Sequence, residues 1–491
     1  MPTLLSSPPS VINTGLESFV DSVTRNGGSA QHLDWQPPGD ADPALAWQLA
    51  QLMGDAADPG SLGTRIEQAN ARACVNIIAA RPLLIDVALR ADGLWPEMKS
   101  DRILLHAGAP VAWPDMCGPM HGAMTGAVLY EGWADTPEKA RAMLERGEIQ
   151  FAQCHDFKAV GPMTGIISAS MPVFVVKNAT HGNLAYTNLN EGIGKCLRFG
   201  ANSPDVLARL KWFERVLAPT LKAATLAAVN STGTGAQEGV DLKSIQAQAL
   251  LMGDEVHSRN AAATALYFMQ MATALAGTNT PQTHVKETLD FISKTSQFFL
   301  NLSMVASKAI MDAAHGIAYS SIVTATARNG TTTAIRVSGL GQEWFEAPSD
   351  LPAGLFFPGF KPSDANPDLG DSAICETAGY GGMSLAASPA LTLLVGGSVA
   401  DATAYSKLMY HITTTRNPAL SLPNLEFEGA PTGMDIRKIV DTGIRPVVTT
   451  GIAHKEAGIG QIGAGLVRPP MACYVKAVRA LAQRHGISGT A

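Results

Sequence analysis

The chain begins with short apolar runs on either side of an amphipathic stretch. Residues 10–15, SVINTG, predict a strand that ends at a glycine turn. In residues 16–28, LESFVDSVTRNGG, apolar side chains recur at helical spacing until two glycines end the pattern. Residues 29–35, SAQHLDW, predict a second strand. This order of strand, helix and strand is typical of a Rossmann-type β-α-β unit.

The same alternation continues to about residue 202. Residues 44–53 and 65–80 predict helices, and the runs PLLIDVAL and DRILLHAG predict strands. The run PVFVVKNA, residues 172–179, is apolar at successive positions, which is typical of a buried parallel strand. We therefore expect a Rossmann-like α/β section over residues 1–202.

After residue 202 the alternation of predicted strands and helices gives way to predicted helices alone. A Ser-Pro-Asp helix start at Ser203 is followed by long segments rich in Ala, Leu and Met. Strands return with SIVTATARNG, TTAIRVSG and GLFFPGF, and residues 472–484 predict a final amphipathic helix. The predicted fold is a multidomain α/β protein, with a mostly helical domain over residues 203–318 and a C-terminal α/β domain with Gly-rich loops over residues 319–491.

Composition narrows the classes of protein that remain. Of the 491 residues, 46% are hydrophobic and 16% are charged, which excludes disorder as the main state and favours subunit interfaces. The net charge is −6 and basic residues are scattered, so we expect no binding to nucleic acid. Since no apolar run approaches about 18 residues, we expect no membrane span. No Lys or Arg precedes Arg25, so no targeting signal is apparent and a cytoplasmic location is expected.

A GxGxxG pattern at Gly458, Gly460 and Gly463 follows the apparent strand RPVVTT. The pattern suggests dinucleotide binding, but no helix opens at its third glycine and the chain ends too soon for a second β-α-β unit. Two interpretations stay open for this loop: a cradle of backbone N–H groups for a small anion, or a structural turn. The titratable residues His454 and Lys455 lie between strand and loop, in what reads as a β-α turn.

Two polar segments lie in the predicted N-terminal section. His155 is adjacent to Cys154, and because neighbouring residues on a strand face opposite ways, His155 lining a site is favoured over a Cys-His dyad. The Gly-punctuated segment after the PVFVV strand carries Asn188, Asn190 and Glu191, which suit a substrate with an amide or a carboxylate. Helix capping by the same residues is the alternative.

Further polar patches lie in the middle and C-terminal sections. Residues 253–260, GDEVHSRN, place Arg259 and three residues at i, i+3 spacing (Asp254, His257 and Asn260) within an otherwise apolar helical stretch. Arg328 and Arg336 on successive strands suit a carboxylate or phosphate, while Asn329 and the glycine after it also read as a hairpin turn.

A third Gly-rich patch, residues 370–382, carries Asp371 and Glu376 as candidate acids or bases. We expect no dinucleotide and no tightly held zinc. The sequence leaves room for a loosely bound Mg²⁺ near Asp254 or Asp371.

Several long strings resemble the YlbE-like family over nearly the whole chain. They are CGPMHGA, GPMTGIISASMPVFVV, NLNEGIGK, GDEVHSRN, ARNGTTTAIRVSGLG, FFPGF, GDSAICETAGYGG, PTGMDIRKIV and GIAHKEAGIGQIGAGLV. The resemblance implies the large subunit of oxamate carbamoyltransferase in allantoin catabolism, which converts oxalurate and phosphate to oxamate and carbamoyl phosphate. It also implies a hetero-complex with an FdrA-like subunit. The resemblance carries no residue-level mechanism, so the site residues below rest on the motifs.

We expect the main site where Gly-rich loops of the first and last sections meet. The candidate catalytic residues are His454, Lys455, Glu191, Glu376 and His155. The candidate substrate-binding residues are Asn188, Asn190, Arg328, Asn329, Arg259, Asp371, Gly458, Gly460 and Gly463. Two alternatives stay open beside carbamoyl transfer in a homo-oligomer or hetero-complex. One is a metal-independent amide or ureide hydrolase that uses water, and the other is a non-catalytic scaffold subunit.

Overall fold

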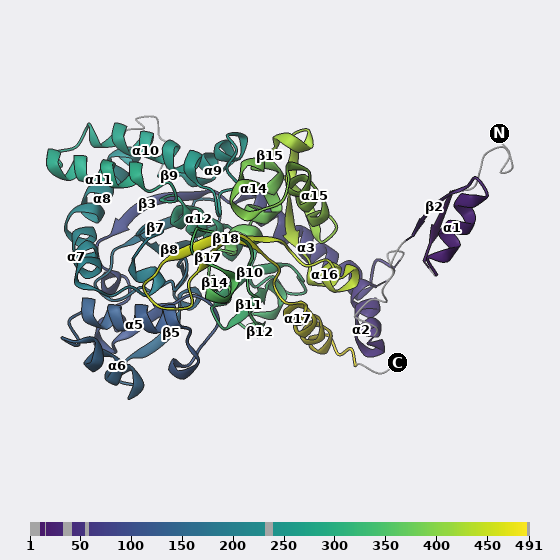
Figure 1. Ribbon diagram of the computed structural model, residues 1–491, viewed down its shortest axis with the longest axis horizontal. Coiled ribbons are helices and arrows are strands. Elements are labelled where there is room, and N and C mark those ends of the chain that lie inside the picture. The colour runs from purple at the N-terminus through teal and green to yellow at the C-terminus, as the bar shows by residue number, and fades with distance from the viewer. Residues whose placement is uncertain (1–9, 15, 33–41, 55–57, 231–238, 489–491) are drawn as a thin grey trace.

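A computed structural model describes residues 10–14, 16–32, 42–54, 58–230 and 239–488. The fold mixes helices with several small sheets, as expected for a multidomain α/β protein (Figure 1). No helix in these ranges is long and apolar enough to cross a membrane.

The predicted N-terminal β-α-β unit is present as a parallel pair, β1 (Ser10–Asn13) and β2 (Ser29–His32), joined by α1 (Ser18–Arg25). No residue of α1 is buried. The unit lies at one end of the molecule, apart from the main body (Figure 1). It therefore adds no strand to the larger sheets described here.

The largest sheet has five strands in the order β6-β8-β7-β3-β9. Their bounds are Ala159–Val160, Leu184–Asn188, Val173–Asn178, Pro82–Ala88 and Val240–Asp241. The expectation of a parallel strand at PVFVVKNA was wrong, because β7 pairs antiparallel with both β3 and β8. Its apolar run has another cause: α12 (Leu300–Asp312) and α8 (Ala218–Asn230) pack on the sheet.

A second parallel pair consists of β4 (Ile103–His106) and β5 (Gln150–Gln153). The chain between these two strands forms α5 (Gly118–Tyr130) and α6 (Pro137–Glu145). The N-terminal section thus carries two parallel units beside a largely antiparallel sheet. Its other helices are α2 (Pro43–Met53), α3 (Leu62–Ala79) and α4 (Glu97–Ser100).

The middle section is helical, as expected. Its helices besides α8 and α12 are α7 (Pro204–Trp212), α9 (Leu242–Leu251), α10 (Ala261–Leu275) and α11 (Gln282–Lys294). Every residue of α12 from Leu300 to Met311 is buried, so this helix runs through the centre of the body. One large core cluster draws Phe174 from the sheet, Met304 from α12 and Tyr380 from the C-terminal section. The division into three domains stays a prediction.

The C-terminal section holds three antiparallel sheets. The strands of the first are β12 (Phe345–Pro348), β11 (Thr332–Val337), β10 (Val323–Asn329) and β14 (Leu369–Gly370). Those of the second are β13 (Ala353–Phe356), β18 (Gln461–Val467) and β17 (Val448–Ala453). The third pairs β15 (Thr413–Leu422) with β16 (Glu428–Met434). The helices are α13 (Ile374–Thr377), α14 (Thr392–Val395), α15 (Val399–Met409), α16 (Ile436–Thr442) and α17 (Met471–Arg484), the last within one residue of its predicted start.

Candidate active site

A cavity of about 590 Å³ opens where the three sequence sections meet. Its walls come from the turn after β5, the start of β8, the C-terminal end of α12, and strands β10 and β11. The lining residues are His155, Asp156, Lys158, Asn183, Leu184, Lys308, Asp312, His315, Thr324, Ala325, Arg336 and Gln342. Three basic side chains, two carboxylates and two histidines in one cavity suit a small polar or anionic ligand.

His155 is the buried imidazole of this cavity. Neither of its ring nitrogens has a hydrogen-bond partner among the described residues, although the side chain is almost fully enclosed. The ring meets the indole of Trp344 edge to face, with centroids 5.2 Å apart. A buried polar group without a partner is costly unless a ligand or water satisfies it. His155 is therefore the side chain of the cavity that most directly indicates a ligand-binding position.

Asp371 lies beneath His155, with Oδ1 3.7 Å from Nε2. That distance is too long for a hydrogen bond but short enough for electrostatic coupling. The two carboxylate oxygens accept hydrogen bonds from the backbone N–H groups of Gly108 at 2.8 Å and Gly161 at 3.1 Å. Asp371 therefore ties three distant segments together directly under the imidazole.

Glycine makes this convergence of segments possible. At Gly108, φ is +85° and a Cβ would come within 2.6 Å of the Asn329 nitrogen. At Gly370, φ is +119° and a Cβ would come within 2.7 Å of the Met163 nitrogen. Only a residue without a side chain fits such positions without displacing the neighbouring backbone. Gly370 is the first glycine of the GDSAICETAGYGG string. By allowing close backbone contact with Met163, it helps to position the carboxylate of the next residue, Asp371.

Burial raises the pKa of Asp371 from 3.8 to about 7, although both N–H donors act in the opposite direction. Burial also lowers the pKa of His155 well below its usual value, with further lowering by the positive charges of Lys308 and Arg336. The imidazole is therefore neutral at neutral pH. A bound anion would counteract the charges of Lys308 and Arg336 and raise the pKa of His155.

Two cations line the cavity, one from α12 and one from β11. Lys308 is almost fully buried on α12 and its Nζ lies 2.7 Å from Oδ1 of Asp312, one turn further along the helix. Arg336 on β11 is also buried; it donates to Oδ1 of Asp156 at 2.7 Å and stacks on Trp344 at 4.2 Å. The Nε of Arg336 has no partner among the described residues. A guanidinium with a free donor, beside a buried ammonium, suits a carboxylate or a phosphate.

Of the residues singled out in the sequence, His155 and Arg336 line this cavity, and Asp371 lies next to His155. Arg328, predicted to bind substrate, instead donates to Asp368 at 2.7 and 3.4 Å in a fully buried ion pair. Asn329 accepts from the backbone of Thr331 and Thr332, which agrees with the hairpin-turn interpretation. Neither residue lines the cavity.

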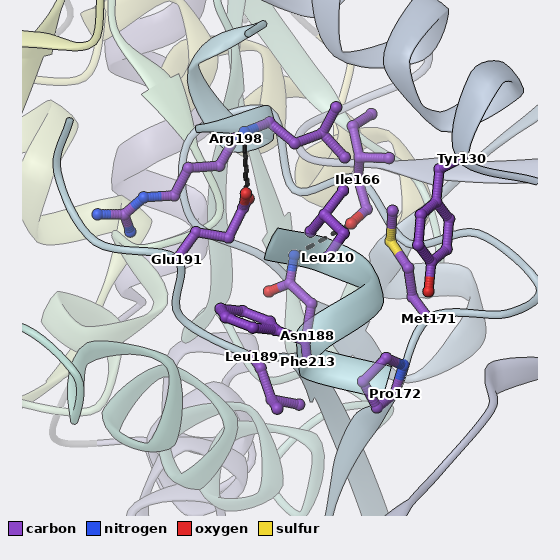
Figure 2. A pocket seen from close by; sticks show the side chains of 11 residues that line it. Tyr130, Ile166, Met171, Pro172, Asn188, Leu189, Glu191, Arg198, Leu210 and Phe213 are labelled. Carbon is purple, nitrogen blue, oxygen red and sulfur yellow. Dashed lines mark hydrogen bonds between the residues drawn. The ribbon is translucent and has the colours of Figure 1, made fainter. Parts of the chain in front are cut away.

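Asn188, Asn190 and Glu191 lie at and after the C-terminal end of β8, whereas Leu184 at the start of this strand lines the cavity. The carboxylate of Glu191 accepts from the backbone of Leu197 and Arg198, and burial raises its pKa. Asn190 donates to Gln297 and Asn301. The small cavity beside them, about 20 Å³, has room for one water molecule. The guanidinium of Arg198 extends away from the other side chains that line it (Figure 2).

The loop with His454, Lys455 and the GxGxxG glycines joins two strands, β17 and β18. The expectation of a β-α turn there was therefore wrong, and Gly463 lies inside β18 rather than at a helix start. Gly458 has its N–H on the Phe199 carbonyl, and Gly460, with φ of +108°, would bring a Cβ within 2.9 Å of the Gly194 carbonyl. The two Gly-rich loops thus meet as expected, in tight backbone contact.

The side chains of this hairpin already have partners. His454 Nδ1 accepts from the Glu456 N–H at 2.9 Å, and its ring packs on Phe360. Lys455 Nζ donates to the Ser363 carbonyl. The assignment of catalytic roles to these two residues stays a prediction.

Residues 253–260 form an irregular loop between α9 and α10, so the expected helix face of Asp254, His257 and Asn260 does not exist. Asp254 instead accepts from the Ala263 N–H, at the start of α10, and pairs with Arg259. Glu376 accepts from His257 Nδ1 at 2.8 Å, deep in the protein. Asp254 and Asp371, near which the sequence leaves room for a loosely bound Mg²⁺, both accept hydrogen bonds from backbone N–H groups. The described ranges hold no group of three or more His, Cys, Asp or Glu side chains that could hold a metal ion.

Lys308 and His315 were missed by sequence reasoning. The signal for Lys308 was present: it is the one charged side chain in residues 300–311, LNLSMVASKAIM, all of which are buried. A charge on an apolar helix is retained only when it is paired or used. His315 follows the same helix and offered no comparable pattern.

The residues that line the cavity lie in the part of the chain that matches a known protein family. A family model described as oxamate carbamoyltransferase subunit AllG matches residues 149–372, which include every residue that lines the cavity and Asp371. Oxamate carbamoyltransferase subunit AllG of Escherichia coli (strain K12) is 51% identical over 426 residues, 86% of this chain and 99% of that protein. Uncharacterized protein YahG of the same strain is 41% identical over 485 residues, 99% of each chain. A crystal structure of a conserved protein of unknown function from Enterococcus faecalis V583 superposes with a TM-score of 0.80 at 42% identity, covering 85% of this chain and 98% of that one.

Proposed function

Because the chain belongs to the family of AllG oxamate carbamoyltransferase subunits, we propose that it serves in a carbamoyltransferase complex and that its cavity binds the reacting groups. The proposed reaction transfers the carbamoyl group of oxalurate to phosphate and gives carbamoyl phosphate and oxamate. The observation that carries this assignment is the enclosed imidazole of His155, unpartnered at both nitrogens, in a cavity that also holds Lys308 and Arg336.

The charges of the cavity suit these substrates. Oxalurate carries a carboxylate, phosphate is a dianion near neutral pH, and both must leave water to react. Arg336 offers a planar guanidinium whose Nε is free, and Trp344 holds that plane in place, so we assign the carboxylate to Arg336. Lys308 offers a point charge, which we assign to phosphate.

The proton balance of the reaction gives His155 its role. A phosphate oxygen attacks the carbamoyl carbon, and the bond from that carbon to the oxamate nitrogen breaks. The hydrogen of monohydrogen phosphate must then move to the leaving nitrogen. A neutral His155 accepts this proton during attack and returns it to the nitrogen, so no proton is gained or lost overall. The Asp371 carboxylate, 3.7 Å from Nε2, stabilises the imidazolium that forms between the two steps.

The same family membership supports a hetero-complex, and we propose that an FdrA-like subunit is one partner. Two functions from different classes compete with carbamoyl transfer. A hydrolase would use water and need no phosphate, and a scaffold would leave the chemistry to its partner. The buried, unpartnered catalytic-type side chains favour transfer within this chain over a scaffold.

The test runs the reaction in both directions with the intact complex and with this chain alone, following products by mass. We expect oxalurate to be consumed only when phosphate is present, and carbamoyl phosphate with oxamate to give oxalurate. Turnover of oxalurate without phosphate would contradict the transferase assignment. Binding of oxamate to this chain alone is measured by calorimetry. Full activity of a complex that carries His155→Ala would show that the cavity is not the site.

A further inference from the structure

Arg198 carries a buried guanidinium with two nitrogens that lack an acceptor in the described part of the chain. The residue is 3% exposed, and its Nε and Nη1 have no hydrogen-bond partner among the described residues. The carboxylate of Glu191 accepts from the backbone N–H groups of residues 197 and 198 and not from this guanidinium. Because an unpaired charge is costly inside a protein, the free donors of Arg198 indicate a position for an anion.

The loop of residues 192–196, just before Arg198, has free N–H groups and engaged carbonyls. The N–H groups of residues 193–196 make no hydrogen bond to any described residue. Cys196 is fully enclosed, so bulk water does not reach its N–H group. The carbonyls of residues 192–195 accept from the Cys196 thiol, the Gln461 N–H and Nη2 of Arg209. Successive free N–H groups are the feature of backbone anion sites.

Arg198 and Arg209 both lie beside this loop. Burial raises the pKa of the Cys196 thiol to about 12, and the positive charges of the two arginines act against that rise. The same two charges oppose the burial that raises the pKa of Glu191, at the other end of the loop. Figure 2 shows the Arg198 guanidinium beyond Glu191, on the side away from Tyr130. Since the Nε of Arg209 also has no partner among the described residues, both arginines have donors available at the loop.

The free groups around the loop are donors, and the charges there are mainly positive. Lys195 adds an ammonium, which lies 3.5 Å from Asp205. Both side chains of that pair are more than half exposed, so the pair is weak. A phosphoryl group has more oxygens than a carboxylate and carries up to about two negative charges at neutral pH. Two guanidinium groups, an ammonium and a row of N–H groups match that larger acceptor.

From these features we propose that the loop of residues 192–196, with Arg198 and Arg209, binds a phosphoryl anion. Inorganic phosphate and the phosphate group of a small metabolite share the chemistry that this site recognises. Neither the loop residues nor the two arginines line the His155 cavity, where the proposed reaction assigns phosphate to Lys308. The two sites are therefore separate, and this inference does not depend on the proposed reaction.

The first test titrates inorganic phosphate into the full chain by calorimetry at constant ionic strength. The chain carries Lys308→Met, which weakens any phosphate site in the His155 cavity. We expect one phosphate per chain, and addition of Arg198→Met should weaken binding by about 10- to 100-fold, as for the loss of a charge-assisted hydrogen bond. The matched control Arg146→Met, at a surface arginine that pairs with Glu148, should leave the affinity unchanged. Absence of phosphate binding in the Lys308→Met chain, or equal affinities with and without Arg198→Met, would overturn the inference.

Two further ligands define the anion in the same assay. Phenyl phosphate that binds as tightly as inorganic phosphate, and depends equally on Arg198, would identify the site as one for a phosphorylated metabolite. Binding of phosphate without binding of phenyl phosphate would identify free phosphate as the ligand. Oxamate that binds at Arg198 more tightly than phosphate would assign the site to a carboxylate and contradict the inference.

Unfolding midpoints separate ligand binding from a purely structural role of Arg198. In phosphate-free buffer, Arg198→Met is expected to unfold at the temperature of its Lys308→Met parent or higher, because it removes an unpaired buried charge. Phosphate should raise the midpoint of the parent and raise that of the variant less. A much lower midpoint of the variant without phosphate would show a structural role and contradict the inference. Arg209→Met provides the same comparison at a half-buried arginine, and equal stabilisation of it and its parent by phosphate would also overturn the proposed site.

Discussion

The imidazole of His155 and the carboxylate of Asp371 face each other across 3.7 Å inside the protein, and burial affects them in opposite ways. Burial favours the neutral form of each group, so it lowers the pKa of His155 and raises the pKa of Asp371 to about 7. Both pKa values are therefore shifted away from their usual ranges, and a proton shared by the pair resides on Asp371 rather than on His155. Pairs of titratable groups with this property recur at catalytic sites.

Asp371→Asn is expected to remove one pH dependence of stability. In the folded chain the Asp371 carboxyl keeps its proton up to about pH 7, whereas in the unfolded chain it loses the proton near 3.8. The folded state thus binds more protons between these values, and stability falls as pH rises through this window. The difference in free energy of unfolding between wild type and variant, measured by denaturant titration, should shift in favour of the variant from pH 4 to pH 7 and then level off. A difference that is constant with pH would contradict the raised pKa.

Lys308→Met is expected to raise the KM for phosphate by about 10- to 100-fold, because it removes one charge-assisted hydrogen bond that contributes about 1.5–3 kcal/mol. The KM for oxalurate should change less. Steady-state kinetics of the complex measure both values, and the unfolding midpoint checks the fold. Lys139→Met is the matched control, because Lys139 also pairs with an acid four residues away but lies on the surface. Equal effects of the two variants would argue against a phosphate role for Lys308.

Arg336→Lys keeps the charge but loses the planar fork and the stacking on Trp344. We expect weaker binding of oxamate by about tenfold or more, with little change for phosphate. Calorimetric titration of oxamate into the chain measures this directly. Arg416→Lys is a suitable control, because Arg416 stacks on Tyr410 and pairs with Glu428 far from the cavity in sequence. Unchanged oxamate affinity in Arg336→Lys would remove the assignment of the carboxylate.

Arg328→Met separates two interpretations of the same residue. The sequence suggested a substrate-binding arginine, which predicts a higher KM in a stable protein. The structure places Arg328 in a buried ion pair with Asp368, so removal leaves an uncompensated charge and is expected to destabilise the fold by about 3–5 kcal/mol. The double variant Arg328→Met with Asp368→Leu should recover part of this loss. A stable single variant with a raised KM would support the substrate-binding interpretation.

Periodicity and local punctuation predicted most elements of the fold. The Ser-Pro-Asp signal at Ser203 marks the start of α7, and the alternation around SVINTG and SAQHLDW marks β1 and β2. These signals are local, because capping and helical spacing depend on neighbours in the chain. The direction of β7 was missed, since apolar residues on both faces report burial and carry no information about which strand lies alongside.

The sequence predicted residues of the candidate site only where a titratable side chain stands out from its neighbours in the chain. His155 stands out beside Cys154 and lines the cavity, and Asp371 stands out in a glycine-rich patch and lies 3.7 Å from the His155 ring. Glu191 carried the same signal, yet its carboxylate caps the backbone of Leu197 and Arg198. Whether a glutamate caps a turn or faces a ligand depends on contacts between distant segments, and the spacing of residues does not record them.

The hydrogen bonds from Gly108 and Gly161 to the Asp371 carboxylate have a consequence for folding during synthesis. The ribosome releases residues in order, so Gly108 and Gly161 emerge more than two hundred residues before their acceptor, Asp371. Contacts of such sequence separation form slowly, because a long loop must close before they do. In a nascent chain the N–H groups of Gly108 and Gly161 therefore lack this acceptor until Asp371 has left the ribosome, so the structure around His155 is completed only late in synthesis.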